Sequence, residues 1–399
     1  MGQPRVEGLP VTVTASAPPS SWRDRKRPLW LLSLLVPALA GAGPAAWLWL
    51  RQDWVLWMPL VLVYVLIPLL DLLVGEDRSN PPESAVPALE ADRYYRHITW
   101  ALVPLLWLAI VFAAWFVMRH PLPLHGLVAV VLSTGVVGGF CINVGHELGH
   151  KRDRLEQWLA RLVLAPTAYG HFTVEHNRGH HRDVATPQDP ASARMGESIY
   201  AFALREIPGA WRRAFVLERE RLGRAGRPWW HPDNELVKTG LITLGLHLVL
   251  VLWLGPAVWP FLIAASLWAN FQLTSANYIE HYGLRRRVGA DGRPEPCRPE
   301  HSWNSNHLVS NWALFQLQRH ADHHAHATRR YQSLRHFPDA PQLPTGYFGM
   351  FVLAYVPPLF FRVMDRRLLE RAGRDPEGLN LHPPRREALL RRHRLHASG

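Results

Sequence analysis

The sequence predicts an all-α protein: an integral membrane bundle of six transmembrane helices, with a cytoplasmic helical cap that holds a histidine-rich metal site. Two observations lead to this fold class. Of the 399 residues, 48% are hydrophobic, and they concentrate in long uncharged runs within residues 29–147 and 238–280. In addition, nine of the 22 histidines fall in four tight clusters, each near the end of an apolar run or in the segment that follows one.

Six stretches are long enough to cross a membrane. Each holds about 20 mostly apolar residues, which is the helix length that a hydrocarbon core of about 30 Å requires. Tryptophan and tyrosine lie near many of their ends, as they do at membrane interfaces. A further apolar stretch at 350–363 contains Pro357 and Pro358 and is expected to be interfacial or re-entrant. The six expected spans cover residues 30–50, 54–73, 99–118, 124–144, 239–259 and 261–279.

The loops between these spans predict their orientation. The connections 51–53 and 119–123 and the Trp259–Pro260 joint are very short, whereas the other connections are long and carry clusters of arginine. Because loops rich in lysine and arginine stay in the cytoplasm, both termini and the long loops are predicted to be cytoplasmic. The fourth and sixth spans then end on the same face of the membrane, so the histidine clusters that follow them can converge there.

The same reasoning divides the chain into six regions. The first is a basic segment whose Pro, Ser and Ala content predicts disorder. The others are four spans, a cytoplasmic helical block with the second cluster, two more spans, a cytoplasmic cap with the third and fourth clusters, and a basic polar tail. Their limits are 1–28, 29–147, 148–237, 238–280, 281–370 and 371–399.

Charge and cysteine content narrow the class of protein further. The net charge is +12, and the basic residues flank apolar helices, which favours anionic lipid headgroups and an acidic partner over nucleic acid. The two cysteines, Cys141 and Cys297, are too few for a disulfide scaffold or a built-in iron–sulfur domain.

The four histidine clusters read HELGH, HNRGHH, NYIEHYG and RHADHH. In the three clusters with several histidines, the spacings of three to five residues place the imidazoles on one helix face. Neutral imidazole binds iron, zinc and copper, and nine imidazoles exceed what one ion can take, so we expect two metal ions to share them. The expected ligands are His146, His150, His176, His180, His181, His281, His320, His323 and His324.

Two other interpretations of the clusters are less economical. HELGH also matches the HExxH motif of zinc proteases, with Glu147 as general base, but such a site needs only three protein ligands and leaves the other clusters unexplained. A histidine-lined metal transporter would place its ligands near the bilayer midplane. Here each cluster falls at or beyond the cytoplasmic end of a helix.

Polar residues near the clusters are candidates to orient the imidazoles, because a metal-bound histidine usually donates its other N–H to a carboxylate or carbonyl. Asp71 is the one acid within an expected span, where it can serve function or merely cap a helix end. The candidates to orient the histidines are Glu147, Glu175, Glu280, Asp322, Asn306 and His307.

The segments HELGHK, EHNRGHHRDVATPQDPAS, ANYIEHYGL and LQRHADHHAHATRRYQSL together resemble the membrane-bound alkane 1-monooxygenase family. The resemblance runs from about residue 28 to 369 and includes RMGESIYAF, HSWNSNHLVSN and LPTGY. Four boxes in this order, with the NYIEHYG element, distinguish the chain from the related acyl-lipid desaturases.

This resemblance implies a non-haem di-iron site held by the nine histidines, O2 as co-substrate, and terminal hydroxylation of n-alkanes to 1-alkanols. It also implies a bacterial inner-membrane location and electrons from rubredoxin, an acidic protein reduced by an NAD(P)H-dependent rubredoxin reductase. The arginines expected to steer rubredoxin are Arg285, Arg286, Arg287, Arg329, Arg330 and Arg335. The alternative is a related membrane di-iron hydroxylase or desaturase that acts on xylene, fatty acyl or sterol substrates.

The chemistry agrees with this resemblance. An unactivated terminal C–H bond needs a strongly oxidising metal–oxygen species, which redox-inert zinc cannot supply. An alkane has no polar handle, so its recognition requires an apolar channel whose end sets the chain length. The second span runs toward the metal face, and it supplies the channel candidates Val63 and Tyr64, with Val61 and Val65 beside them.

Overall fold

The computed structural model describes residues 22–373 and 375–395, and within these ranges it is helical, with isolated β-bridges and no strands. The predicted all-α class is therefore confirmed. Most of the basic N-terminal segment, which the sequence predicts to be disordered, lies outside the described residues, as does the end of the polar tail.

Four helices are long and apolar enough to cross a membrane: Asp53–Val74, α5 (Arg93–Arg119), α6 (Leu124–Gly149) and α11 (Glu235–Leu254). The helices η1 (Arg27–Leu35) and α1 (Ala38–Leu50) meet at an angle of 51° and together make a candidate fifth span. The chain is thus a multi-pass membrane protein with four or five candidate spans.

The six-span count is not confirmed. Residues 261–279, the expected sixth span, lie in α12 (Val258–His281), which does not reach the apolarity of a membrane-crossing helix. The reason is visible in its sequence, because Gln272, Asn277 and Glu280 all face the protein interior. A helix that is enclosed by other helices can carry such polar side chains without exposing them to lipid.

The joint between the last two expected spans also differs from the prediction. The sequence predicts it at Trp259–Pro260, but α11 ends at Leu254, where Gly255 takes a positive φ of 90°. Glycine adopts this left-handed conformation without strain and commonly ends helices. Pro260 instead sits in the first turn of α12, where its missing N–H costs no helical hydrogen bond.

The span Asp53–Val74 is not a uniform helix. It begins as a 3-10 turn (η2, Asp53–Trp57), continues through α2 (Met58–Val61), passes through a π-helical turn (η3, Leu62–Leu66), and ends as α3 (Ile67–Val74). π turns are rare and are frequent at functional sites. The channel candidates Val63 and Tyr64 both lie in this π turn.

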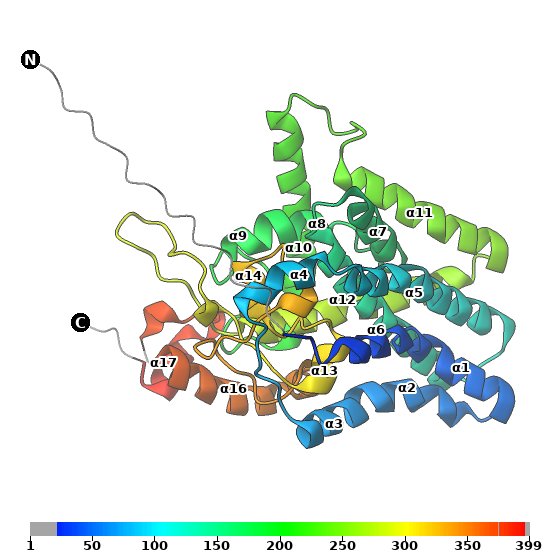
Figure 1. Cartoon of the computed structure of the whole chain (residues 1–399), viewed down its shortest axis with the longest axis horizontal. Coiled ribbons are helices and arrows are strands. Elements are labelled where there is room, and N and C mark those ends of the chain that lie inside the picture. The colour runs from blue at the N-terminus through cyan, green and yellow to red at the C-terminus, as the bar shows by residue number, and fades with distance from the viewer. Residues whose placement is uncertain (1–21, 374, 396–399) are drawn as a thin grey trace, which may run out of the picture.

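Helix α6 lies at the centre of the bundle (Figure 1) and packs along α12. Glycines make the close approach possible. A Cβ atom on Gly135 would lie 2.6 Å from the ring of Trp268, and one on Gly138 would lie 2.6 Å from the Cβ of Ala269. Small residues at helix contacts are typical of membrane bundles, because they let two backbones approach closely.

The cap is made of helices that follow α6 and α12, and all of them except α10 are shorter than these two. After α6 come α7 (Arg154–Leu164), α8 (Phe172–Glu175), the π turn η6 (His176–His180), α9 (His181–Asp183) and α10 (Ile199–Arg224). After α12 come α13 (Leu308–Ala313), α14 (His320–Ala325), α15 (Tyr347–Ala354), α16 (Pro357–Ala372) and α17 (Arg386–His393). Before α5, α4 covers Val86–Ala91, and the remaining 3-10 turns are Glu83–Ala85, Ala165–Thr167, Pro299–His301, Tyr331–Ser333, Pro376–Gly378 and Pro383–Arg385.

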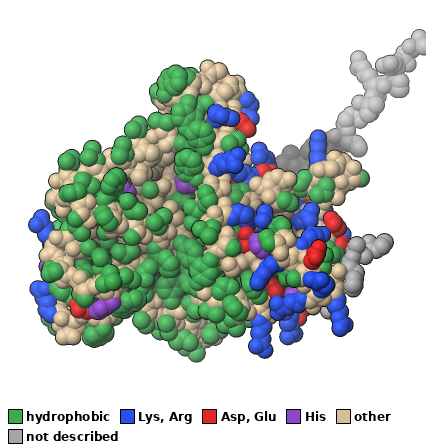
Figure 2. All heavy atoms as spheres, turned by 180° about the vertical axis from the view of Figure 1, so that it is seen from behind, with side chains coloured by type: hydrophobic (Ala, Val, Ile, Leu, Met, Phe, Trp, Pro, Cys, Tyr) green, Lys and Arg blue, Asp and Glu red, His purple; other side chains and the backbone are tan. Residues whose placement is uncertain are grey.

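The surface follows the same division (Figure 2). Hydrophobic side chains cover a broad band, while lysine and arginine gather at one end of the molecule and at the opposite edge. Such a distribution is expected where a bilayer surrounds the band and basic side chains meet lipid headgroups.

Asp71 ties the end of the second span to the cap. Its buried carboxylate accepts hydrogen bonds from the backbone N–H of Ser310, at 3.0 Å, and from the Ser310 hydroxyl. Gly346 leaves room for this contact, because a Cβ there would overlap Asp71 Oδ2. Of the two roles left open by the sequence, the structure therefore gives Asp71 a structural one that joins α3 to α13.

Candidate metal centre

The nine cluster histidines come together in two adjoining groups. Within each group, one ring nitrogen per histidine lies within 4.8 Å of all the others. The groups touch each other, since the ring centroids of His181 and His324 are 4.6 Å apart. The first group contains His146, His150, His176, His181 and His323, and the second contains His180, His281, His320 and His324.

The nitrogens inside each group converge at short range. Nε2 of His323 lies 2.9 Å from Nε2 of His146 and 3.0 Å from Nε2 of His181. A neutral imidazole carries a single N–H, so these nitrogens cannot all be satisfied by bonding to one another. Since a metal–imidazole bond is about 2.1 Å long, two nitrogens bound at right angles to one ion lie about 3 Å apart. The first group therefore fits a metal ion.

The second group has the same features. Nε2 of His320 lies 3.2 Å from Nε2 of His281 and 3.0 Å from Nε2 of His324. Nε2 of His180 is buried and has no hydrogen-bond partner among the described residues, and the same is true of His150 in the first group. Buried ring nitrogens without partners are costly unless something binds them, so the donor set of both groups fits metal ions.

The sequence boxes do not map one to one onto the groups. His176 and His181 belong to the first group, whereas His180, between them in sequence, belongs to the second. The chain in this segment is π-helical from His176 to His180, so the directions of successive side chains differ from those of an α-helix. The imidazoles of this box still lie side by side, with the ring centroids of His176 and His180 5.2 Å apart, but they are shared between the two groups, and the RHADHH box is shared in the same way.

Burial keeps five of these cap imidazoles neutral. It lowers the pKa of His176, His320, His323 and His324 well below the usual range, and the neighbouring histidines lower it further. Burial and His180 lower the pKa of His181 to about 3. A neutral imidazole is the form that binds metal, because protonation occupies the lone pair.

Two hydrogen bonds orient histidines of the second group. Nδ1 of His180 lies 3.0 Å from the buried carboxylate of Asp189, and Nδ1 of His281 lies 3.2 Å from the carbonyl oxygen of His301. Burial acts to lower the pKa of His180, but Asp189 outweighs it, so the pKa is raised. Sequence reasoning missed Asp189, although it lies in the same motif, HHRDVATPQD.

Only one of the six residues expected to orient the histidines contacts one of them. Oε2 of Glu280 lies 3.5 Å from Nε2 of His320, and its other oxygen accepts from the Tyr347 hydroxyl at 2.9 Å. The other five have different contacts: Glu147 pairs with Lys151, Glu175 with Arg213, Asp322 with Arg329, Asn306 with His336, and His307 with Ser305.

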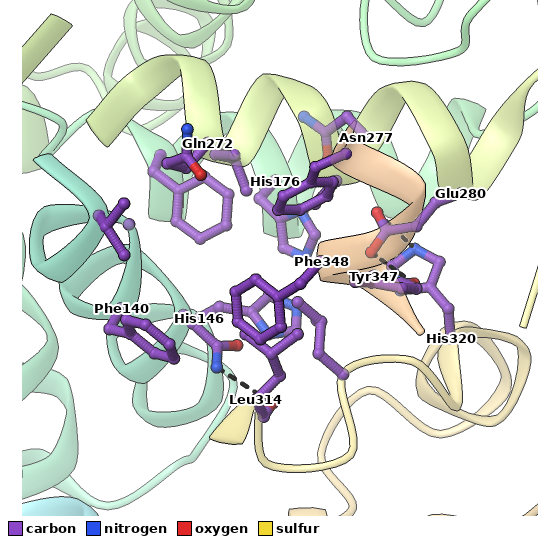
Figure 3. A pocket seen from close by; sticks show the side chains of 18 residues that line it. Phe140, His146, His176, Gln272, Asn277, Glu280, Leu314, His320, Tyr347 and Phe348 are labelled. Carbon is purple, nitrogen blue, oxygen red and sulfur yellow. Dashed lines mark hydrogen bonds and ion pairs between the residues drawn. The ribbon is translucent and has the colours of Figure 1, made fainter. Parts of the chain in front are cut away.

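A narrow cavity leads from the histidines into the bundle (Figure 3). The volume of this cavity is about 50 Å³. Gln272 and Phe140 lie at one end and Glu280 and His320 at the other, with Phe348 between them. His146 and His176 of the first group also line it, so the cavity opens onto both groups.

The far end of this cavity is about 15 Å from the histidines. Val136, which lines it, precedes His146 by ten residues of α6, and a helix rises about 1.5 Å per residue. Apart from the histidines, Glu280 and Tyr347, the polar side chains of the wall are Gln272, Asn143 and Asn277, and the other lining residues are apolar. A cavity with this length and lining suits an unbranched hydrocarbon chain.

The channel candidates from the second span lie behind this wall. Val63 is buried in the core, and neither Val63 nor Tyr64 lines the cavity. Tyr64 nevertheless reaches it, because its hydroxyl donates to Oε1 of Gln272 at 2.6 Å. The amide nitrogen of Gln272 lies 3.2 Å from the Tyr355 hydroxyl, so two tyrosines hold the glutamine that closes this part of the cavity.

A membrane helix bundle with clustered histidines at one end is the architecture of membrane-bound metal oxidoreductases. The sequence profile of the fatty acid desaturase family matches residues 121–354 of this chain. The chain belongs to that family of membrane oxidoreductases. Alkane 1-monooxygenases are about half identical to this chain over nearly its whole length. This chain therefore belongs to the alkane 1-monooxygenase family.

Two alkane 1-monooxygenases and one more distant relative show the range of similarity. The chain is 52% identical to alkane 1-monooxygenase 1 of Alcanivorax borkumensis over 366 residues, which is 91% of this chain and 90% of the relative. It is 49% identical to alkane 1-monooxygenase of Ectopseudomonas oleovorans over 389 residues, covering 97% and 96%. The hydroxylase component of xylene/toluene monooxygenase from Pseudomonas putida is 28% identical over 250 residues, covering 62% and 65%.

Proposed function

We propose that this protein is an alkane 1-monooxygenase that hydroxylates the terminal carbon of medium- to long-chain n-alkanes with O2. One oxygen atom enters the terminal C–H bond and the other leaves as water, which consumes two electrons and two protons. The observation that carries the proposal is the narrow apolar cavity that ends on His146, His176 and His320. It can deliver the end of a linear chain, and only the end, to the histidine groups.

Two irons are the proposed cofactor, one in each histidine group. The first would be held by the group of five and the second by the group of four, and imidazole ligands suit iron. When bound, the iron pair supplies the redox chemistry that activates O2, which zinc cannot do. The orienting role belongs to Asp189 at His180 and to the His301 carbonyl at His281.

The residues around the metal end of the cavity have separate roles in the proposal. Phe140, Phe348 and Phe351 hold the alkyl chain by apolar contact and exclude water. Glu280 lies where the chain meets His320, and Tyr347 holds its carboxyl group, so Glu280 is placed to accept or donate a proton there. Tyr64 acts from behind the wall on the position of Gln272, and Val63 packs in the core beside it in sequence.

Rubredoxin, reduced by an NAD(P)H-dependent rubredoxin reductase, is the proposed electron donor, and it would meet the basic face of the cap.

We further propose six spans, with α12 as the sixth, a location in the bacterial inner membrane, and cytoplasmic termini. The regions proposed above, with limits at 28, 147, 237, 280 and 370, follow from that topology. Accessibility of single cysteines placed in the loops, measured from each side of the membrane, tests it.

The decisive experiment uses the purified full-length protein with rubredoxin, its reductase and NAD(P)H. Metal analysis should give about two irons per chain, and alkanes from octane to hexadecane should yield 1-alkanols. A fatty acyl substrate, a xylene and a sterol test the alternative on the same protein. Desaturated acyl chains or hydroxylated xylene in place of alkanol, or tightly bound zinc with protease activity, would overturn the proposal.

A further inference from the structure

Two asparagines line the cavity near the histidines: Asn143 of α6 and Asn277 of α12. Asn143 precedes His146 by three residues on its helix. Asn277 precedes His281 by four residues on the other helix. Because a helix rises about 1.5 Å per residue, both amides lie about 4.5–6 Å short of these histidines along the helices. We refer to the two residues as the asparagine pair.

A backbone carbonyl fixes the side chain of Asn143. Nδ2 of Asn143 donates to the carbonyl oxygen of Leu314 at 3.0 Å, and the contact is buried. A carbonyl oxygen can only accept, so the nitrogen of the amide must be the atom that faces Leu314. Oδ1 of Asn143 then has no hydrogen-bond partner among the described residues. It is not enclosed by protein, so it opens to the cavity that Asn143 lines.

A buried carboxylate fixes the side chain of Asn277 in the same way. Nδ2 of Asn277 donates to Oε1 of Glu206 at 3.1 Å. Glu206 lies on α10 and is buried, and its Oε2 accepts from the Thr274 hydroxyl at 2.7 Å. Oδ1 of Asn277 likewise has no partner among the described residues and opens to the cavity. Asn277 lies between Gln272 and Glu280 on the wall of the cavity (Figure 3).

Outside the histidine groups, the other polar side chains of the wall already have partners. Gln272 is held at its oxygen by Tyr64 and at its nitrogen by Tyr355. Glu280 accepts from the Tyr347 hydroxyl. The wall therefore leaves two amide oxygens open, and an amide oxygen can only accept a hydrogen bond. An alkane offers no donor, an ether offers only an acceptor, and a hydroxyl group offers the donor that these oxygens lack.

We propose that the asparagine pair binds the hydroxyl group of a 1-alkanol inside the cavity. This inference rests on the proposed function, because a 1-alkanol is the product of the proposed reaction. An alcohol bound there has drawn its first carbon back from the histidines by about 4.5–6 Å, roughly one helical turn. Glu206 is a positioning residue, because it acts through Asn277 and keeps the amide oxygen toward the cavity.

Four variants test the pair and its support. Asn277→Leu removes the amide oxygen at similar side-chain size, and Asn270→Leu makes the same change on α12 at a residue that does not line the cavity. Glu206→Leu removes the acceptor that holds the Asn277 amide. Glu206→Gln keeps an acceptor oxygen for Nδ2 of Asn277, so it should restore what Glu206→Leu loses.

The test uses the full-length, iron-loaded protein in phosphatidylcholine nanodiscs without a reductant. A photoreactive alkane with a diazirine in its chain labels the cavity, and three compounds of equal length compete with it: nonane, 1-octanol and 1-methoxyheptane. Mass spectrometry of the cross-linked peptides restricts the reading to the lining segments of α6, α12 and α15. Each variant is compared with wild type in identical nanodiscs, so partitioning of the competitors into lipid cancels.

The advantage of 1-octanol over 1-methoxyheptane as a competitor should fall about fivefold in Asn277→Leu and in Glu206→Leu. It should stay within about twofold of wild type in Asn270→Leu and in Glu206→Gln. Competition by nonane uses neither amide oxygen, so it should change less than about twofold in all four variants. A loss of packing alone would instead weaken all three competitors together.

A wild-type advantage of 1-octanol that survives in Asn277→Leu would overturn the inference, as would a Glu206→Leu protein that matches Glu206→Gln. If Asn277→Leu does not fold, Asn143→Leu and the two Glu206 variants decide by the same ratio. Turnover of nonane by the wild-type preparation separates the two proposals. Hydroxylation of nonane without the expected ratios removes only the asparagine pair, and the expected ratios without hydroxylation remove the proposed function.

Discussion

Nδ1 of His180 lies 3.0 Å from a carboxylate oxygen of Asp189, and both side chains are fully enclosed. Asp189 is held in turn by the Ser192 hydroxyl at 2.7 Å and by Arg213 at 3.2 Å. This arrangement fixes the His180 ring so that Nε2 points into the second histidine group. In the proposed di-iron site, the carboxylate would therefore position the metal ligand His180 without binding metal itself.

The substitution Asp189→Asn tests this positioning role. The asparagine side chain would keep the shape of the aspartate but lose the charge that orients His180, so iron affinity or alkane hydroxylation should fall about 10- to 100-fold. Iron content, alkane turnover and the iron spectrum should change together. The matched control is Asp233→Asn at the surface, and a full iron complement with wild-type turnover in Asp189→Asn contradicts the assignment.

The division of the histidines predicts separate losses of iron. His281→Ala removes a ligand from the group of four, and His146→Ala removes one from the group of five. Each should lower the iron content from about two to about one per chain and abolish hydroxylation, because both ions take part. Mössbauer spectra of the two variants should show different remaining irons. His125→Ala, at an exposed position on α6, should retain both ions.

The convergence of the nine histidines could be predicted from sequence, because spacing and loop charge place every box on one side of the membrane. Their division could not. It depends on the π turn at His176–His180, which local sequence does not specify, and on pairings such as His323 with His146 between segments 177 residues apart. Asp189 was missed for a similar reason, since nothing in the motif tells which acid faces His180.

The second span shows another limit of the sequence. The sequence predicts that Val63 lines the channel, yet the π turn and the approach of α15 bury it in the core, while Phe348 and Phe351 of α15 line the cavity instead. For the segment around α15, the sequence predicts only an interfacial or re-entrant position. Tertiary packing decides which of two apolar segments reaches the cavity, and apolar periodicity alone does not distinguish them.

The far end of the cavity predicts a change of chain-length range. Val136→Phe adds volume where the end of a long chain would lie, about 15 Å from the histidines. Hexadecane hydroxylation should fall about tenfold while octane hydroxylation stays within about twofold. Val128→Phe, at a lipid-facing position on α6, controls for a general effect of the added ring. Equal losses for octane and hexadecane would indicate damage to folding instead.

Tyr64→Phe tests the proposed role of the second span. It removes the hydroxyl that holds Gln272 at 2.6 Å and leaves the ring in place. The glutamine side chain, then held only by Tyr355, should move more easily and open the end of the cavity, so the ratio of hexadecane to octane turnover should rise about threefold. Tyr200→Phe removes a hydroxyl that contacts Tyr355 from an exposed position and serves as the control. An unchanged ratio in a stable Tyr64→Phe protein removes Tyr64 from this role.

Electron delivery should depend on salt through a smaller set of arginines than the sequence implied. Arg329 and Arg330 are held by the buried acids Asp322 and Glu156. Arg286 is also buried and bonds to backbone carbonyls. These three stabilise the cap, whereas Arg285 is partly exposed and Arg287 is exposed and paired with Asp375 at 3.2 Å, and both arginines line a surface hollow with His301. Acidic rubredoxin should therefore be attracted mainly by this pair.

The variant Arg285→Glu with Arg287→Glu should raise the KM for rubredoxin about tenfold at low salt and leave the KM for alkane unchanged. The difference from wild type should shrink as salt shortens the screening distance to about 8–10 Å near physiological ionic strength and below that at higher salt. Arg51→Glu, in a short loop at the other side of the bundle, provides the control. A rubredoxin KM that is constant across salt in both proteins, with the lipid held fixed, places the docking surface elsewhere.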